Sequence, residues 1–551
     1  MAGKRATNAG SERTAAGKRP SLVLGRSSLA GGGALSSVVR AGLAAASLAA
    51  VIVVLNGGWA GPALAFVAGA GAGILAASWV DWRHPREARR LGLVAGAVAG
   101  ALLLAAQAFR DWPLQWLAGQ APAPLAATLV TALASLVIAT ATGAAFGAIQ
   151  AQPVAQRRLV TNLLLALYLV LYPIIDGATG LGWIGQMIAV LIFVLLALGL
   201  NIVVGYAGLL DLGYAAFFAI GAYATGLLSS PHLGIQLNFW LVIWLAAAVA
   251  ALFGVILGAP TLPLRGDYLA IVTLGFGEIV PIVIRNLTAV VIREPITGIC
   301  LAGCERPLNL TGGVQGINPI GRPALPVIGE FQPGNYLPWY YLILALIVFS
   351  VFLINRLYRS RLGRAWTAIR EDELAAAVMG VDLVKTKLLA FAMGATFSGF
   401  AGAFYAAYIS AIFPTTFDFS ISVIVLCMVI LGGMGNMVGV ILGGLIIMSA
   451  DRIFLPQFAS LSQAVLTTSV FPLIPNAALR EFLGNAVDPS QLRLLLFGLT
   501  LVLMMNIRPE GLVPSARRRA ELHEEAELKE AAEQPPTPSE VQSPAVTLVG
   551  E

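Results

Sequence analysis

Few residues of this sequence could act as nucleophiles, general bases or phosphate ligands. Only three histidines occur among 551 residues, and neither H-E-x-x-H nor G-x-S-x-G is present. The lysines stand at positions 4, 18, 385, 387 and 529, and none belongs to a G-x-x-x-x-G-K-[ST] phosphate-binding loop. We therefore expect no catalytic residue, no metal site and no cofactor in this chain, and an enzyme is the poorest interpretation.

Charged side chains are concentrated in one internal segment, 356–387. If its middle is helical, alanines, Ile369 and Met379 form an apolar side. Most charged residues of the same stretch then lie on the other sides: Arg364, Arg370, Glu371 and Asp372. The pattern predicts one short amphipathic helix that ends at Gly380, where a glycine suits a helix terminus. A plain surface helix with no partner is the alternative.

Composition indicates which elements must position this segment. Hydrophobic residues make up 58% of the chain, charged residues only 11%, and the mean hydropathy is +0.83. Four long stretches contain no charge at all: Leu91–Phe109, Leu125–Ile149, Leu159–Ile175 and Gly177–Leu210. Such runs are long enough to cross a bilayer, and in lipid their backbone must be helical. The sequence predicts an all-α, polytopic transmembrane helical bundle.

We expect about twelve to fourteen spans, since three of the fourteen candidates are weak. The candidates are 41–56, 61–80, 91–109, 124–148, 159–175, 184–205, 208–229, 239–260, 268–290, 337–355, 388–410, 419–434, 436–454 and 491–507. The weak ones are 41–56, 208–229 and 419–434, which could be broken or re-entrant. With the N-terminus inside, the arginine-rich loops fall on the inner side, as the positive-inside rule requires. The segment 356–387 is then an inner loop, with its helix parallel to the membrane.

Composition divides the chain into four parts. Residues 1–37 form a basic cytoplasmic arm that we expect to be disordered, and 511–551 form a charged cytoplasmic tail of the same kind. Residues 38–175 form an N-terminal membrane region, and 176–510 form a second membrane region that contains the charged segment 356–387. The net charge of +6 comes from tails and loops, so it does not indicate nucleic-acid binding.

Two carboxylates interrupt the apolar stretches. Glu278 follows Asp267 by eleven residues, which places it roughly 15 Å deep, near the bilayer centre. A carboxylate there is expensive, so it is either functional or paired, with Arg285 as the obvious local partner. Asp211 lies within about one turn of the inner face. A solvated or helix-capping role is the alternative to a transport role at that position.

Two alanines, three intervening residues and a glycine give the inner loop a recognisable spacing: Ala375, Ala376 and Gly380. This resembles the coupling loop with which ABC importer permeases dock on their ATPase. The resemblance implies that the loop couples transport to ATP hydrolysis through Arg364, Arg370, Glu371, Asp372, Glu373, Ala375, Ala376 and Gly380. The glutamate usual just before the alanines is Leu374 here, with acids one to three positions earlier.

Further segments are similar to the LivM-type permeases of branched-chain amino acid importers. They are Gly199–Phe217 (GLNIVVGYAGLLDLGYAAF), Leu264–Glu278, Leu310–Ile317 and Leu431–Asn436. The similarity extends over about 184–507. It implies a permease subunit in the bacterial inner membrane that moves leucine, isoleucine and valine. Urea, another small amino acid or an amide is the alternative substrate.

The resemblance also implies partners. They are two ABC ATPase subunits that bind the ATP, a second permease of the LivH type, a periplasmic substrate-binding protein and membrane lipid. An ion-coupled secondary transporter is the rival from another class. It would need more buried carboxylates or histidines than these spans offer, where we count essentially Glu278 alone.

Glycines in the first LivM-like segment indicate a broken helix, because each weakens a helix by about 1 kcal/mol relative to alanine. A broken helix exposes backbone groups that can hold a small charged solute. The candidate pathway residues are Asn201, Gly205, Tyr206, Gly208, Asp211, Tyr214 and Glu278. Close helix packing is the alternative for each glycine, and we prefer it for Gly435, Gly439 and Gly443.

Cys300 and Cys304 fall in the long outer loop 291–337. In an oxidising periplasm they could form a small disulfide across three residues. Two free thiols fit the spacing as well.

Overall fold

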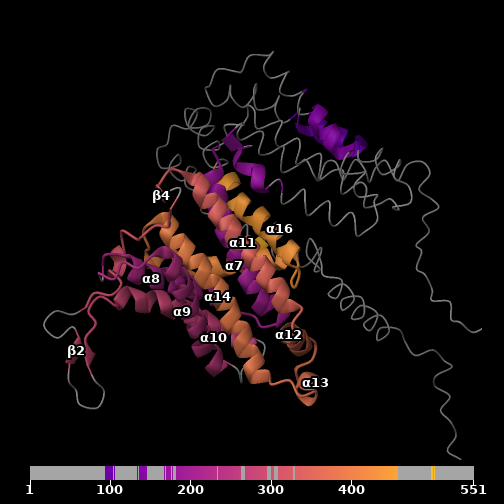
Figure 1. Ribbon diagram of the computed structural model, residues 1–551. Coiled ribbons are helices and arrows are strands. Elements are labelled where there is room, and N and C mark those ends of the chain that lie inside the picture. Colours follow the sequence, from indigo (N-terminus) through magenta and orange to yellow (C-terminus); the bar gives the residue numbers. More distant parts are fainter. Residues whose placement is uncertain are drawn as a thin grey trace, which may run out of the picture. The chain divides into compact units, whose positions relative to one another are not determined.

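The computed structural model describes residues 182–261 except 233, then 267–293, 300–302, 308–326 and 329–456, with short pieces between 93 and 177 and between 495 and 502 (Figure 1). The chain divides into two compact units, 1–113 with 122–165, and 114–121 with 166–551. The predicted arms 1–37 and 511–551, and the predicted spans 41–56 and 61–80, lie outside the described residues. The predicted domain boundaries at 175 and 510 stay predictions.

In the first unit, residues 93–103 and 136–144 are helical where the structure describes them. They pack tightly through glycine: a Cβ on Gly96 would come 2.4 Å from the carbonyl oxygen of Ala139, and one on Gly100 would come 2.9 Å from Leu136 Cα. Small residues at such crossings let helix backbones approach closely in a membrane.

In the second unit, six described helices are long and apolar enough to cross a membrane. They are Ile184–Tyr206, Phe239–Pro260, Tyr268–Asn286, Tyr336–Tyr358, Leu383–Ile409 and Pro414–Gly432. The prediction of a helical membrane bundle is confirmed, while the total number of spans stays a prediction. Tyr214–Ser229 is a shorter apolar helix in the same unit.

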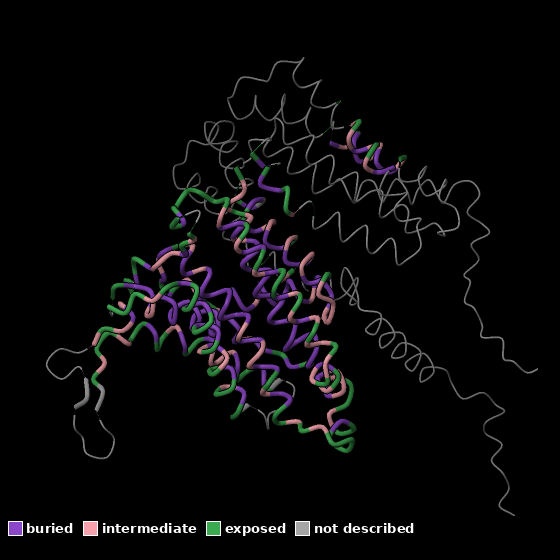
Figure 2. The backbone as a smooth tube through the Cα atoms, in the orientation of Figure 1, coloured by how far each residue is buried: buried purple, intermediate pink, exposed green. Residues whose placement is uncertain are grey.

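Helix α7 (Ile184–Leu200) lies at the centre of this unit and contains no charged residue. Every residue from Val190 to Leu200 is buried (Figure 2). A helix that is hydrophobic all round belongs in the interior of a bundle, which is where α7 lies. It continues without a break into a π-helical segment, η3 (Asn201–Tyr206), whose six residues are all buried.

Helix α14 (Leu383–Ile409) lies alongside α8 (Tyr214–Ser229) and α9 (Phe239–Thr261) (Figure 1). Glycine residues again allow the backbones of these helices to lie close together. A Cβ on Gly399 would come 2.7 Å from Ala250 Cβ, and one on Gly221 would come 2.6 Å from Gly399 Cα. Helix α11 (Tyr336–Tyr358) and helix α16 (Met437–Ser449) pack on α7.

Helices α15 (Phe419–Gly432) and α16 form a hairpin across residues 433–436, so the predicted spans 419–434 and 436–454 are two short helices with a tight turn. Gly433 and Gly435 have φ of 109° and 81°, which only glycine adopts without strain. A Cβ on Gly443 would come 2.4 Å from Met428 O, in agreement with its predicted packing role. The helix ends in a second π-helical segment, η6 (Ala450–Phe454).

Helix α10 (Asp267–Asn286) has a largely exposed surface, and its beginning contacts the loop before α8. The predicted span 208–229 begins only at Tyr214, because residues 207–213 form an irregular connection after η3. In the loop 291–337, which we predict to be outer, two small hairpins are described: β1 (Ile292–Arg293) with β2 (Cys300–Ala302), and β3 (Ala324–Leu325) with β4 (Gly329–Glu330).

Replacing Gly399 by alanine tests the packing of α14. The added methyl group would come 2.7 Å from Ala250 Cβ and 2.8 Å from Ala247 Cα. Overpacking costs about 1–3 kcal/mol, which exceeds the gain of about 1 kcal/mol in helix propensity. We expect Gly399→Ala to lower the melting temperature of the detergent-solubilised chain. Gly275→Ala is the control, because nothing lies within 4 Å of its Cβ position, and it should leave that temperature unchanged or raise it. Equal melting temperatures would contradict the packing argument.

Candidate coupling site and buried junction

The charged segment after α11 forms two helices, not the single helix that we predicted. Helix α12 (Arg361–Glu371) begins after Ser360, whose hydroxyl accepts from the amides of Leu362 and Gly363. Helix α13 (Glu373–Val378) follows at once. Asp372 separates them with an extended backbone, φ −154° and ψ 111°, and its carboxylate caps α13 by accepting from two backbone amides. A capping aspartate starts a new helix more readily than it continues an old one, and this is why the prediction was wrong.

Helix α12 is fixed against the beginning of α14. The indole of Trp366 is buried and donates to the carbonyl of Thr386 at 2.9 Å. The Lys387 ammonium, with a side chain 7% exposed, pairs with the Glu373 carboxylate. Asp382 caps α14 and accepts from the Lys385 amide, a hydrogen bond that lowers the pKa of its carboxyl. These contacts hold the segment in one position relative to the bundle.

Helix α13 is largely exposed (Figure 2), and three of the exposed residues at the helix and its end are large and apolar. Leu374, Val378 and Met379 are 66%, 87% and 82% exposed. The helix ends at Val378, and Gly380, two residues later, has a φ of +85°, which favours glycine. Of the remaining predicted coupling residues, Ala376 is buried, while Arg364, Glu371, Asp372 and Ala375 are exposed. We call Leu374, Val378 and Met379 the apolar tip.

Arg370 points in the opposite direction, into the protein. Its guanidinium donates to the carbonyl oxygen of Gly205 in η3. Gly208, with φ +71°, lies directly against the Arg370 side chain: a Cβ there would come 2.8 Å from its Cγ. The last carbonyls of a helix have no partner inside the helix and carry partial negative charge, so they attract a cation. Arg370 therefore ties α12 to the end of α7 and η3.

Asn201 connects a third element, the turn between α15 and α16, to η3 and α12. Its side-chain oxygen accepts from the Gly435 amide at 2.9 Å, which joins η3 to the turn between α15 and α16. Asn201 is fully buried. We call Asn201, Gly205, Arg370 and Gly435 the buried junction. A Cβ on Gly205 would come 2.0 Å from the Asn201 oxygen, so no other residue fits there without movement.

The structure thus places four candidate pathway residues beside the charged segment 356–387, which we call the coupling segment after its predicted role: Asn201, Gly205, Tyr206 and Gly208. The ring of Tyr206 contacts that of Tyr358, with centroids 4.7 Å apart, at the end of α11. Tyr214 lies within the bundle, where its hydroxyl donates to Gly394 O at 3.0 Å.

Asp211 is buried and stabilises the connection into α8. Its carboxylate accepts from the Gly213 amide at 2.9 Å. The neighbouring Leu212 amide donates to Thr273 Oγ1 at 3.1 Å. Asp211 also lines a cavity of about 240 Å³ with Phe276 and other apolar residues of α9, α10 and α14. None of the other candidate pathway residues lines this cavity.

Glu278 is exposed on α10 in the isolated chain. Its neighbour Gly277 packs against Gly213, in the connection that contains Asp211. Among the described residues no ion pair joins Glu278 to Arg285, which is exposed as well. Cys304 and the side chain of Cys300 lie outside the described residues, so the predicted disulfide stays a prediction.

Two charged residues within a predicted span escaped the sequence analysis. Asp451 and Arg452 lie in η6, inside the predicted span 436–454, with Arg452 Nε 3.4 Å from Asp451 Oδ2. The signal was present: adjacent opposite charges in an apolar run satisfy the rule that singled out Glu278. Our count of buried carboxylates omitted Asp451.

The described helices of membrane-spanning length form a bundle, and an exposed segment is tied to its interior through Arg370, which suits a membrane transport protein. The family model of the permease component of branched-chain amino acid transport systems matches residues 182–505. The chain belongs to this family, and it is a transport component and not a catalytic subunit.

Individual branched-chain amino acid permeases are also similar to this chain in sequence. The high-affinity branched-chain amino acid transport permease LivM of Salmonella typhimurium is 38% identical over 60% of this chain and 70% of its own length. LivM of Escherichia coli is 37% identical over 62% and 72%. The LivH permease of Escherichia coli is 28% identical over 26% of this chain and 42% of its own length. No solved structure matches.

Replacing Arg370 by glutamine tests the buried junction. A hydrogen bond to a charged group contributes about 1.5–3 kcal/mol. Without it, the amides of 361–378 should exchange with deuterium roughly ten to a hundred times faster, because local opening becomes easier. Arg361→Gln is the control, since Arg361 is exposed on the same helix. If both variants exchange like the unmodified chain, Arg370 does not hold α12 to η3.

Proposed function

We propose that this chain is the permease through which an ABC importer moves branched-chain amino acids across the bacterial inner membrane, with ATP hydrolysed by separate subunits. Membership of the family carries the proposal. The substrate class is that of the relatives named above, and the sequence contains no phosphate-binding loop of its own. Urea or another small amino acid remains the alternative.

The apolar tip of α13 is the surface that we assign to the ATPase. Three large apolar side chains at least 66% exposed on a short soluble helix are costly unless a partner covers them. The rigid mounting by Trp366, Lys387 and Asp372 suits a segment that must transmit force. Movement of α13 would reach η3 and the turn at Gly435 through Arg370, so that ATP-driven displacement of the tip shifts α7 and α15 together.

The complete importer would contain two ATPase subunits, a second permease of the LivH type and a periplasmic binding protein. The LivH similarity over 141 residues supports a second permease of related architecture. Both termini would be cytoplasmic, on the side of the apolar tip and of the arginine-rich loops.

From the position of Glu278 we infer that the transport path runs along α10. A carboxylate near the bilayer centre that faced lipid would cost at least about 2.5 kcal/mol even on insertion scales. The exposed face of α10 would therefore border water or the second permease. Asp211 and its cavity lie near the inner end of the same helix, beside Thr273. The two carboxylates would mark successive positions of one path.

Uptake assays test the substrate. A strain that lacks this gene, grown with and without a plasmid copy, is given labelled leucine and labelled urea. We expect the plasmid to restore leucine uptake and to leave urea uptake unchanged, because the relatives are branched-chain amino acid permeases. Restored urea uptake with no leucine uptake would select the alternative substrate.

A charge on the apolar tip tests docking. Val378→Asp places a carboxylate on a side chain that is 87% exposed, so folding should be unaffected, while burial of the unpaired charge against a partner is costly. We expect the ATPase to co-purify at least tenfold less with this variant. Val314→Asp, at a 67% exposed valine of the outer loop, is the matched control. Undiminished co-purification of the Val378 variant would exclude the tip as the docking surface.

A further inference from the structure

A second cavity lies at the end of the bundle opposite the coupling segment. Its volume is about 640 Å³, within the range of small-molecule sites. It is lined by the beginning of α7, the first residue of α11, the end of α14 and the segment η6 with the two residues after it: Gly182, Gly185, Gln186, Ala189, Tyr336, Tyr408, Ile409, Asp451, Arg452, Leu455 and Pro456.

Chain direction fixes the side on which this cavity opens. The C-terminal end of α7 with η3, and the turn before α16, meet at the buried junction. Helix α11 ends, and helix α14 begins, at the coupling segment. The opposite ends of all four helices therefore lie together, on the side that we predict to be the outer one. These are the ends that line the cavity.

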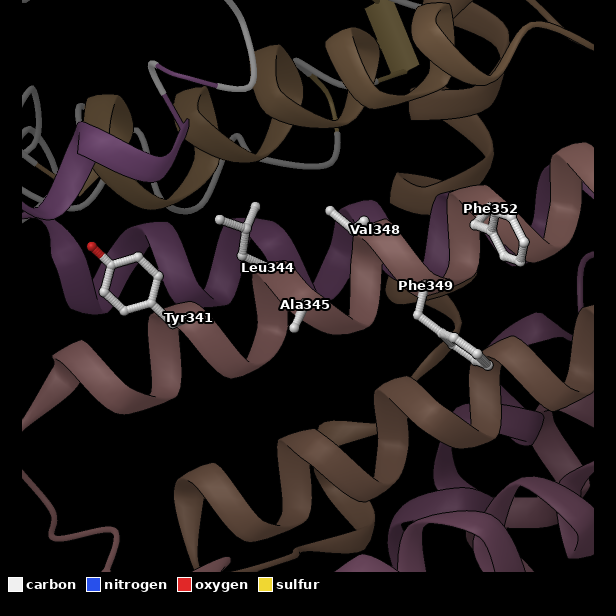
Figure 3. A pocket seen from close by; sticks show the side chains of 6 residues that line it. All are labelled: Tyr341, Leu344, Ala345, Val348, Phe349 and Phe352. Carbon is white, nitrogen blue, oxygen red and sulfur yellow. The ribbon is translucent and has the colours of Figure 1, made fainter. Parts of the chain in front are cut away.

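The cavity contains a pair of opposite charges. The Asp451 side chain is 3% exposed and the Arg452 side chain 45% exposed, with 3.4 Å between Oδ2 and Nε. The Arg452 guanidinium also lies 5.8 Å above the ring of Phe193. By contrast, the apolar groove of about 540 Å³ along α11 has no charged lining residue, and its side chains belong to one helix (Figure 3). Lipid can fill such a groove, but it cannot solvate an ion pair.

We propose that Asp451 and Arg452 form an outer subsite that holds the α-ammonium and α-carboxylate groups of an aliphatic amino acid. A zwitterion needs one anionic and one cationic partner a few ångströms apart, and guanidinium pairs well with carboxylate. Ala189, Ile409 and Leu455 supply an apolar surface for the side chain. The inference rests on the proposed function, because it names the residues that receive the same substrate on its way in.

The π-helical form of η6 is consistent with a binding role. Single π-helical turns inside α-helices occur frequently at functional sites, because the widened turn redirects side chains and frees backbone groups. Here the widened turn contains the two charged residues of the cavity. A purely structural ion pair is the competing explanation, and the experiment must separate the two.

The test uses the complete transporter in proteoliposomes with its binding protein, and measures leucine imported per ATP hydrolysed. Asp451→Asn and Arg452→Gln remove one charge each with little change in shape. We expect each to lower this ratio about tenfold, as loss of one charge-assisted hydrogen bond does. Glu330→Gln, at an exposed carboxylate of the outer β4 strand, should leave it unchanged. A structural role alone would reduce assembly and leave the ratio of assembled complexes unaltered.

Gly185→Leu gives a test that does not touch the charges. A Cβ at this position meets only the ring of Tyr336, at 3.5 Å or more, so a longer side chain can extend into the cavity. We expect the same loss of leucine transported per ATP. In the unmodified complex, added leucine should slow amide exchange in 446–456. If that exchange is unchanged by leucine and the variants keep the original ratio, the subsite does not exist. If the unmodified transporter imports no leucine, the proposed function fails instead.

Discussion

The hydrogen bond from the Arg370 guanidinium to the Gly205 carbonyl connects the soluble and membrane parts of this protein. It forms because α7 ends in a π-helical turn whose last carbonyls have no partner within the helix. The same turn places the Asn201 oxygen against the Gly435 amide. One arginine and one asparagine therefore join α12, η3 and the α15–α16 turn. Any displacement of the coupling segment must either break these contacts or move the helices with it.

Such transmission requires a bundle that does not deform. Close backbone contact at Gly221, Gly399 and Gly443 provides it, because each crossing leaves no room for even a methyl group. In a membrane the hydrophobic effect does not drive helices together, so close packing of small residues carries much of the stability. The glycines that weaken individual helices thereby make the assembly rigid.

Few charged residues lie in the described membrane helices, and they fall into two groups. One group forms a salt bridge, and the other borders cavities or lies on an exposed helix face. Lys387 and Glu373 neutralise each other where the coupling segment meets α14, which is a structural arrangement. Asp451, Arg452 and Asp211 border cavities, and Glu278 lies on an exposed face of α10. Because uncompensated charge is expensive in lipid, each of these residues needs a charged or hydrogen-bonding partner or contact with water. Asp451 pairs with Arg452, and Asp211 accepts from the Gly213 amide.

The sequence by itself determined the fold class and the family, because apolar run length and short motifs are local properties of the chain. It also located Gly380, Arg370 and Asn201 as residues of interest. Only the tertiary structure decided what they do. The break at Asp372 depends on a side-chain cap, and the direction of Arg370 depends on an orphan carbonyl 165 residues away. The outer cavity is formed by residues from four separate elements, and no local pattern reports that distant helix ends meet.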